Sequence, residues 1–172
     1  MILLTAAILL SFERIAYILV WRRPEAFRAL CERVGLGPPV LALRRLFYLF
    51  KAIQGVVFLG WCCYFGASSY SLIDLRPIPF AVGAMLIALG QTFNFGVFYR
   101  LGTVGVFYGN RFGHEVEWCH QFPFSILDHP QYVGALLSIW GFFIAMRYPV
   151  GDWYLLPVLE TVYYAMGALL ES

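Results

Sequence analysis

Several long apolar runs decide what this chain can fold into. Residues 1–21, 46–64 and 80–99 are each about twenty residues long and mostly apolar, and a helix of that length crosses the roughly 30 Å of hydrocarbon in a bilayer. Backbone groups in hydrocarbon must be bonded within helices or a closed barrel, and these runs lack the alternation of barrel strands. With 61% hydrophobic and 13% charged residues, the chain is predicted to be an all-α integral membrane protein.

The number of crossings depends on two further apolar segments near the end of the chain. Residues 133–146 and 153–170 are separated by a turn-rich stretch in which Pro149 and Gly151 break the helix. The first segment has only about fourteen residues, which is short for a full crossing, so the pair fits either two spans or a helical hairpin. We therefore predict one domain over residues 1–172, a bundle of four to five transmembrane helices with a polar cytosolic loop.

A basic connector indicates the orientation in the membrane. Residues 22–45 hold six arginines and two glutamates, with a Gly/Pro run over 35–39 between two short amphipathic pieces. Lys and Arg are enriched in cytoplasmic loops, so the connector is predicted on the cytosolic side. With five spans, the polar stretch 101–134 and Glu171 would lie on the same side.

Composition also argues against other kinds of site. The net charge is only +2 and the arginines gather near predicted membrane edges, so we expect a lipid bilayer and no nucleic acid as partner. The four cysteines form no CxxC pair, so we expect neither a disulfide framework nor a metal site. The sequence carries no indication of the oligomeric state.

Charged residues interrupt two of the predicted spans. Glu13 and Arg14 lie near the middle of the first run, where an unpaired charge costs several kcal/mol. They break the pattern of a signal peptide, so this run is predicted to be a retained helix. The pair either helps to dock the helix or lines a headgroup pocket. Lys51, near the start of the second long run, is expected to snorkel outward.

Residues 101–134 form the most polar part of the chain and hold all three of its histidines. This stretch is the first place to look for a functional site. Its glycines at positions 102, 105, 109 and 113 recur every three or four residues, the spacing of one helix face. They predict either close helix packing or an open backbone surface around a ligand.

Three runs carry a resemblance to a known family: GQTFNFGVFYRLGTVGVFYGNRFG, FPFSILDHPQYVG and the terminal LLES. In their order and spacing they resemble the phospholipid N-methyltransferase family, and most closely its plant-type phosphatidyl-N-methylethanolamine N-methyltransferases, over roughly residues 80–172. The resemblance implies an endoplasmic reticulum membrane enzyme whose site faces the cytosol. Its reaction would use S-adenosyl-L-methionine to convert the membrane phospholipids phosphatidyl-N-methylethanolamine and phosphatidyl-N,N-dimethylethanolamine to phosphatidylcholine. The alternatives are a prenylcysteine carboxyl methyltransferase and a non-catalytic membrane scaffold of the same fold.

The resemblance also implies where the cofactor binds. The family has a GxG in its third helix and a paired acid at the end of its last helix; here these positions read Ala-Leu-Gly over 88–90 and Glu-Ser over 171–172. A glycine would let the cofactor approach the helix backbone, and Glu171 would bind its ribose hydroxyls or ammonium group. The residues expected to contact the cofactor are Leu89, Gly90, Gly105, Gly109, Pro130, Glu171 and Ser172.

Methyl transfer requires a neutral amine held in line with the methyl group, at about 3–3.5 Å. An alkylamine has a pKa near 10, so a base is needed. An imidazole titrates near neutral pH, so His129 is the first candidate, with Asp128 and Tyr132 as further catalytic candidates. Alternatively, His129 only fixes its turn by hydrogen bonding. Arg111 is expected to bind the lipid phosphate, or to snorkel at the interface, and Tyr108 offers an aromatic face to the methylated ammonium.

Overall fold

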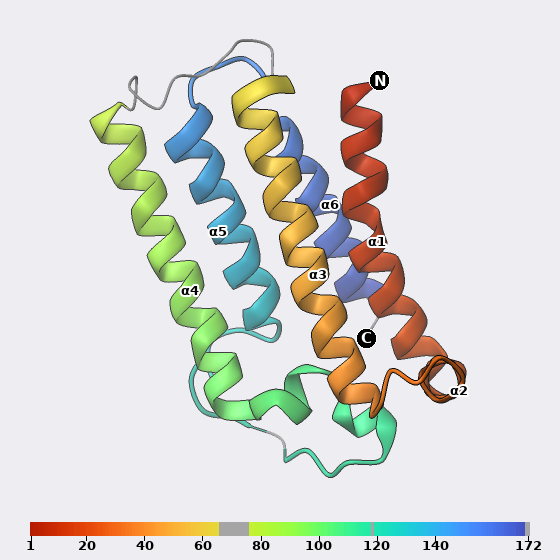
Figure 1. Cartoon of the computed structure of the whole chain (residues 1–172). Coiled ribbons are helices and arrows are strands. Elements are labelled where there is room, and N and C mark those ends of the chain that lie inside the picture. The colour runs from red at the N-terminus through yellow and green to blue at the C-terminus, as the bar shows by residue number, and fades with distance from the viewer. Residues whose placement is uncertain (66–75, 118, 171–172) are drawn as a thin grey trace.

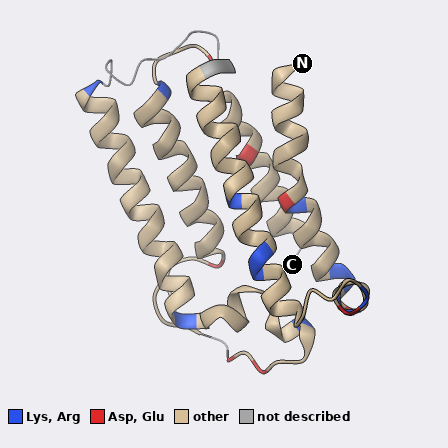
Figure 2. Ribbon diagram, viewed as in Figure 1, with Lys and Arg blue, Asp and Glu red and all other residues tan. Residues whose placement is uncertain are grey.

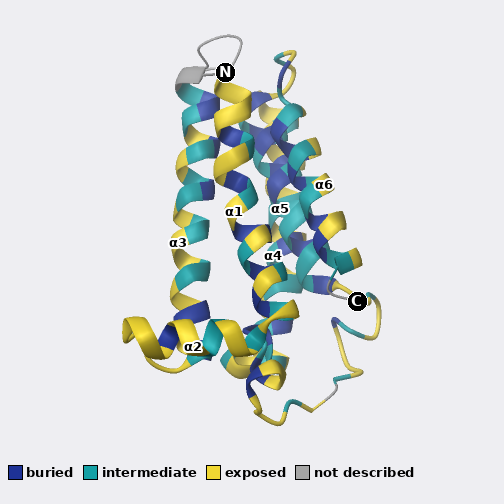
Figure 3. Ribbon diagram, turned by 90° about the vertical axis from the view of Figure 1, so that its right-hand side faces the viewer, coloured by how far each residue is buried: buried dark blue, intermediate teal, exposed yellow. Residues whose placement is uncertain are grey.

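The computed structural model describes residues 1–65, 76–117 and 119–170, and in these ranges every regular element is a helix. Helices α1, α3, α4, α5 and α6 stand side by side, and α2 lies across one end of them (Figures 1 and 3). The elements are α1 (Ile2–Arg22), α2 (Pro24–Val34), α3 (Pro39–Gly60), the π-helical turn η1 (Trp61–Phe65), α4 (Pro77–Val106), the 3-10 turn η3 (Gly109–Phe112), α5 (Pro130–Arg147) and α6 (Leu155–Leu170).

Among the described residues, three helices are long and apolar enough to cross a membrane. They are α1, the segment Pro39–Cys63 and the segment Pro77–Phe112. This confirms the prediction of an all-α membrane protein. The count of four to five crossings depends on α5 and α6, which are 18 and 16 residues long and lie beside the others. Helix α5 is longer than the predicted 133–146 because Pro130, at its N-terminus, has the φ angle that starts a helix.

The interpretation that the four glycines from 102 to 113 share one helix face is wrong. Helix α4 is kinked at Gly102, whose φ of 60° and ψ of −174° are not helical, and it ends at Val106. Gly109 lies in η3, and Gly113 follows it with a φ of 85°. Glycine adopts positive φ at little cost, so Gly102 and Gly113 redirect the chain across the end of the bundle.

Helices α4 and α5 approach each other backbone to backbone through two pairs of glycines. A Cβ atom added at Gly141 would lie 2.6 Å from the Gly83 carbonyl oxygen, and one at Gly134 would lie 2.6 Å from the Gly90 carbonyl oxygen. No side chain fits at such distances. Gly83 and Gly90 on α4 thus permit close packing against α5.

A buried ion pair closes the end of the bundle opposite α2. Arg147 is fully buried, and its Nε and Nη2 atoms donate to the two carboxylate oxygens of Asp152 at 2.8 and 3.0 Å. Its Nη1 atom donates to the carbonyl oxygen of Cys62 at 3.0 Å. The turn between α5 and α6 is thereby fixed to η1, which follows α3.

Helix α2 accounts for the basic connector. Its inner face docks on the bundle through Phe27 and Cys31, and the Phe27 ring lies 6.0 Å from that of Phe112. Arginines gather at this end of the bundle (Figure 2). Of the two amphipathic pieces that the sequence predicts, only the first forms a separate helix, because the second continues directly into α3.

The glycine contacts between α4 and α5 can be tested by adding a single methyl group. Gly83→Ala places a Cβ against the Gly141 backbone and Ala145, and we expect it to lower the free energy of unfolding by about 1–3 kcal/mol. Gly55→Ala is the matched control, because its Cβ would meet nothing within 4 Å. Thermal unfolding of both variants in detergent measures the difference. Equal unfolding temperatures would contradict the close packing.

Candidate active-site cavity

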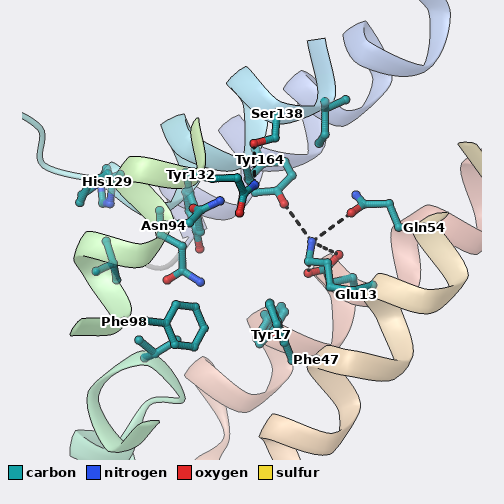
Figure 4. Close-up of a pocket in the computed structure, with 18 of the residues that line it drawn as sticks. Glu13, Tyr17, Phe47, Gln54, Asn94, Phe98, His129, Tyr132, Ser138 and Tyr164 are labelled. Carbon is teal, nitrogen blue, oxygen red and sulfur yellow. Dashed lines mark hydrogen bonds and ion pairs between the residues drawn. The ribbon is translucent and has the colours of Figure 1, made fainter. Parts of the chain in front are cut away.

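A cavity of about 910 Å³ lies between α1, α3, α4, α5 and α6 and reaches the end of the bundle near α2. Most of its wall is aromatic or aliphatic, but polar side chains face each other across it (Figure 4). Helices α1 and α3 supply one polar side, and α4 with the start of α5 supplies the other. The polar and charged lining residues other than tyrosines are Glu13, Arg14, Lys51, Gln54, Gln91, Asn94, Asp128, His129, Gln131 and Ser138.

Lys51 joins three helices on the first polar side. Its Nζ atom lies 3.1 and 3.2 Å from the two carboxylate oxygens of Glu13 on α1. It also donates to the Gln54 Oε1 atom at 3.1 Å and to the Tyr164 hydroxyl of α6 at 3.3 Å. We call the set Glu13, Arg14, Lys51, Gln54, Glu160 and Tyr164 the charged wall.

The second acid of the charged wall lies behind the cavity surface. Glu160 is 1% exposed, and its Oε1 atom accepts a hydrogen bond of 2.7 Å from Gln54 Nε2. Gln54 therefore links Lys51 to Glu160, because its carbonyl oxygen accepts from Lys51 and its amide nitrogen donates to Glu160.

Arg14 is held among aromatic rings on the same wall. Its Nη2 atom lies 3.0 Å from a Glu13 carboxylate oxygen, and its guanidinium carbon lies 4.0 Å from the centre of the Tyr164 ring. The rings of Tyr17 and Tyr132 lie 5.5 and 5.6 Å away. Arg14 is only 7% exposed, and its Nε atom is buried without a hydrogen-bond partner.

The opposite side of the cavity is uncharged where α4 meets α5. Gln91 Nε2 donates to Ser138 Oγ at 2.9 Å, and this hydroxyl donates to the Gly134 carbonyl oxygen, also at 2.9 Å. The Asn94 Oδ1 atom is buried without a partner, and the side chain of Asn94 points into the cavity (Figure 4). Both amides thus face the interior, as amides within a membrane span are expected to do.

The start of α5 forms the polar mouth of the cavity. Asp128 and His129 are exposed there and precede the buried Pro130. The His129 ring stacks on Tyr132 with a centroid distance of 5.8 Å, and Tyr132 meets Tyr164 edge to face at 5.4 Å. A row of rings therefore connects the mouth to the charged wall.

The cavity also reaches the outer surface between α3 and α4. Tyr48 and Leu59 on α3 and Phe95 on α4 line it, yet they are 61%, 51% and 70% exposed. Side chains that line the cavity and are also exposed on the outer surface form the rim of a lateral opening. In a membrane, this opening would face the lipid.

Comparisons with known proteins assign the chain to a family. A family model described as phospholipid methyltransferase matches residues 78–172, more than half of the chain. The chain belongs to this family. No solved structure gave a significant match.

Curated relatives point the same way. The chain is 32% identical to phosphatidyl-N-methylethanolamine N-methyltransferase of Arabidopsis thaliana over 120 residues, which cover 70% of this chain and 65% of the relative. It is 35% identical to human phosphatidylethanolamine N-methyltransferase over 97 residues, which cover 56% of this chain and 48% of the relative. The chain therefore spans between about half and just under two thirds of the length of these relatives.

Of the site residues predicted from the sequence, six line the cavity of this phospholipid methyltransferase family member. They are Gly105, Tyr108, Asp128, His129, Pro130 and Tyr132. The structure thus brings the end of α4 and the start of α5 together at one site. The predicted catalytic residues are adjacent to one another at its mouth.

The other predicted residues that the structure describes do not line the cavity. Gly90 packs against Gly134, and Leu89 lies on the outer face of α4 at 47% exposed. Gly109 is buried against Val104, where a Cβ atom would clash. Arg111 is exposed, and its guanidinium carbon lies 3.6 Å above the Trp21 ring. Glu171 and Ser172 lie outside the described residues.

The expectation that Lys51 snorkels outward is wrong, because Glu13 and Tyr164 on neighbouring helices offer it partners inside. Glu13 docks α1 through its ion pair with Lys51 on α3, and both Glu13 and Arg14 line the cavity. That this cavity takes a lipid headgroup stays a prediction. The sequence interpretation missed Gln54 and Glu160. The signal was available, because ionisable residues inside a membrane span usually face the bundle interior and pair there.

Proposed function

We propose that this protein transfers methyl groups from S-adenosyl-L-methionine to phospholipid amines. Its substrates would be phosphatidyl-N-methylethanolamine and phosphatidyl-N,N-dimethylethanolamine, and its final product phosphatidylcholine. The observation that carries the proposal is a polar cavity with a lateral opening, within a chain of the phospholipid methyltransferase family. We place the protein in the endoplasmic reticulum membrane with the mouth of the cavity toward the cytosol.

The lateral opening supports a substrate that stays in the bilayer. Acyl chains could remain among the exposed apolar side chains of α3 and α4 while the headgroup enters the cavity. A lipid would then reach the site without its hydrocarbon chains crossing water, which is unfavourable for apolar surface.

The cavity fits the proposed cofactor in size and in polar groups. A volume of about 910 Å³ is at the upper end of the range of about 300–1,000 Å³ typical of ligand sites. Arg14 Nε and Asn94 Oδ1 are buried without partners, so each could bond to a ligand. S-adenosyl-L-methionine supplies an electrophilic methyl group on a sulfonium. Gly105 and Pro130 would border it in the cavity, and Glu171 and Ser172 at the end of α6.

The substrate amine must lose a proton before its lone pair can attack. His129 and Asp128 at the mouth are the proposed acceptors, because they face both the cavity and water, to which the proton must finally pass. Stacking on Tyr132 holds the His129 imidazole against the start of α5. Tyr132 would thus orient the base and offer its ring to the methylated ammonium.

Arg111 is the proposed partner of the lipid phosphate. Stacking on Trp21 uses the face of its guanidinium and leaves the N–H groups at the edge directed outward. Tyr108, three residues earlier, lines the cavity and meets Trp21 edge to face at 5.3 Å. The phosphate would therefore lie at the interface, with the amine reaching inward past Tyr108.

The direct test is an assay in membranes with labelled S-adenosyl-L-methionine. We expect label in phospholipid when the monomethyl or dimethyl lipid is supplied, and the unmethylated lipid is run as a third acceptor. Label in a prenylcysteine ester instead would indicate the carboxyl methyltransferase. Binding of S-adenosylhomocysteine without transfer to any of these acceptors would contradict the proposed substrates, and absence of binding would indicate a scaffold.

The lateral opening can be narrowed at Gly55. Gly55 lines the cavity, and a Cβ atom there would meet nothing within 4 Å. We expect Gly55→Trp to lower kcat/KM for long-chain lipids by about tenfold or more, because the ring would obstruct the headgroup path. Ala52→Trp on the exposed side of α3 is the control. Equal losses in both variants would show that the opening is not the route.

The role of His129 can be tested against another histidine of the same loop. His129→Ala should lower kcat by about 100-fold or more if the imidazole accepts the proton. His120→Ala should leave kcat near wild type, because His120 is exposed and does not line the cavity. Initial rates with saturating cofactor measure both. An unchanged rate for His129→Ala would contradict this role. His129 would then only fix the turn at the start of α5.

A further inference from the structure

Among the lining residues that the structure describes, Arg14 and Lys51 are the arginine and the lysine. They differ in how far their hydrogen-bonding capacity is used. An ammonium group has three N–H donors, and Lys51 places Glu13, Gln54 and Tyr164 around its nitrogen at 3.1–3.3 Å. Lys51 is therefore saturated by the protein itself and has no donor left for a ligand.

Arg14 retains unused capacity. A guanidinium has five N–H donors, and the ion pair with Glu13 engages only the Nη2 atom. The Nε atom is buried without any partner, although the side chain lines the cavity. A buried donor in this state is unfavourable, and an oxygen acceptor on a ligand would relieve it.

The surroundings of Arg14 favour an anion. Glu13 is shared between Arg14 and Lys51, so two cations face one carboxylate at this point of the wall. Glu160 lies one layer behind, where it accepts from Gln54. Because the Glu13 carboxylate is divided between two cations, Arg14 keeps an unused N–H donor that a negatively charged oxygen would satisfy.

The same surroundings fix the direction of the guanidinium. Tyr164 covers its face at 4.0 Å, and Tyr17 and Tyr132 flank it, so the group cannot rotate freely. Near Gly167 the wall carries no side chain, and a Cβ atom there would lie 3.8 Å from Arg14 Nη1. The guanidinium is thus oriented in advance, which lowers the entropy lost on binding.

We propose that Arg14 is the anion-binding residue of the cavity and that it holds an oxoanion of a ligand. Resting on the proposed function, this anion is either the carboxylate of the methyl donor or the phosphate of the lipid. Both groups accept charge-assisted hydrogen bonds from a guanidinium edge.

The test compares wild type with Arg14→Gln in the full chain, purified in detergent. Calorimetry gives the Kd of S-adenosylhomocysteine and of its analogue without the carboxylate, and methylation assays give the KM for the monomethyl lipid. If the carboxylate binds Arg14, the variant should bind S-adenosylhomocysteine about 10- to 100-fold more weakly and the analogue as well as wild type does. If the phosphate binds there, the KM should rise by a similar factor while both Kd values stay unchanged.

A second variant guards against misfolding. Arg14→Gln leaves Glu13 with Lys51 as its remaining ionic partner, whereas Arg14→Lys keeps a positive charge beside Glu13 and removes the Nε donor. The Arg14→Lys variant should unfold near the wild-type temperature and still show weakened binding. Wild-type Kd and KM values in both folded variants would overturn the inference and leave the proposed function standing. A wild-type protein that binds and methylates nothing would overturn both.

Discussion

Ionisable side chains are costly when they face hydrocarbon, and this constraint accounts for how one half of the bundle is assembled. Glu13 and Arg14 on α1, Lys51 on α3 and Glu160 on α6 all lie within long or apolar helices, so each must find partners on its neighbours. They do so in one connected set. The charged wall therefore holds α1, α3 and α6 together and also gives the cavity a polar surface deep inside an apolar protein.

The two sides of the cavity wall differ in chemistry, and only one of them is covered by the family match. The family match covers α4, α5 and α6, which include the polar mouth and the glycine contacts. Helices α1 and α3 lie before the match, yet they supply Arg14, Lys51 and the α3 side of the lateral opening. Properties that depend on α1 and α3 thus cannot be transferred from the family model and have to be argued from this chain.

The helices could be predicted from the sequence because continuous apolar runs have one stable solution in lipid. Which way a side chain points could be predicted less well. The Lys51 side chain could extend outward to the interface or inward to the cavity. Which direction it takes depends on Glu13, which is 38 residues away in the chain. Likewise, the spacing of the glycines does not reveal that Gly102 has a positive φ and bends α4. The mouth residues were found because Asp128, His129 and Tyr132 are close in sequence, whereas the charged wall is assembled from three distant helices.

The glycine pairs between α4 and α5 have a mechanical consequence. The carbonyl oxygens of Gly83 and Gly90 on α4 already pack against the backbone of α5, so α4 and α5 cannot move closer together. We expect the two helices to behave as one rigid unit. Helix α3 has no comparable backbone contact with α4 along the lateral opening, where the rim consists of long side chains. Widening of the lateral opening would therefore require α3 to move away from the α4–α5 pair.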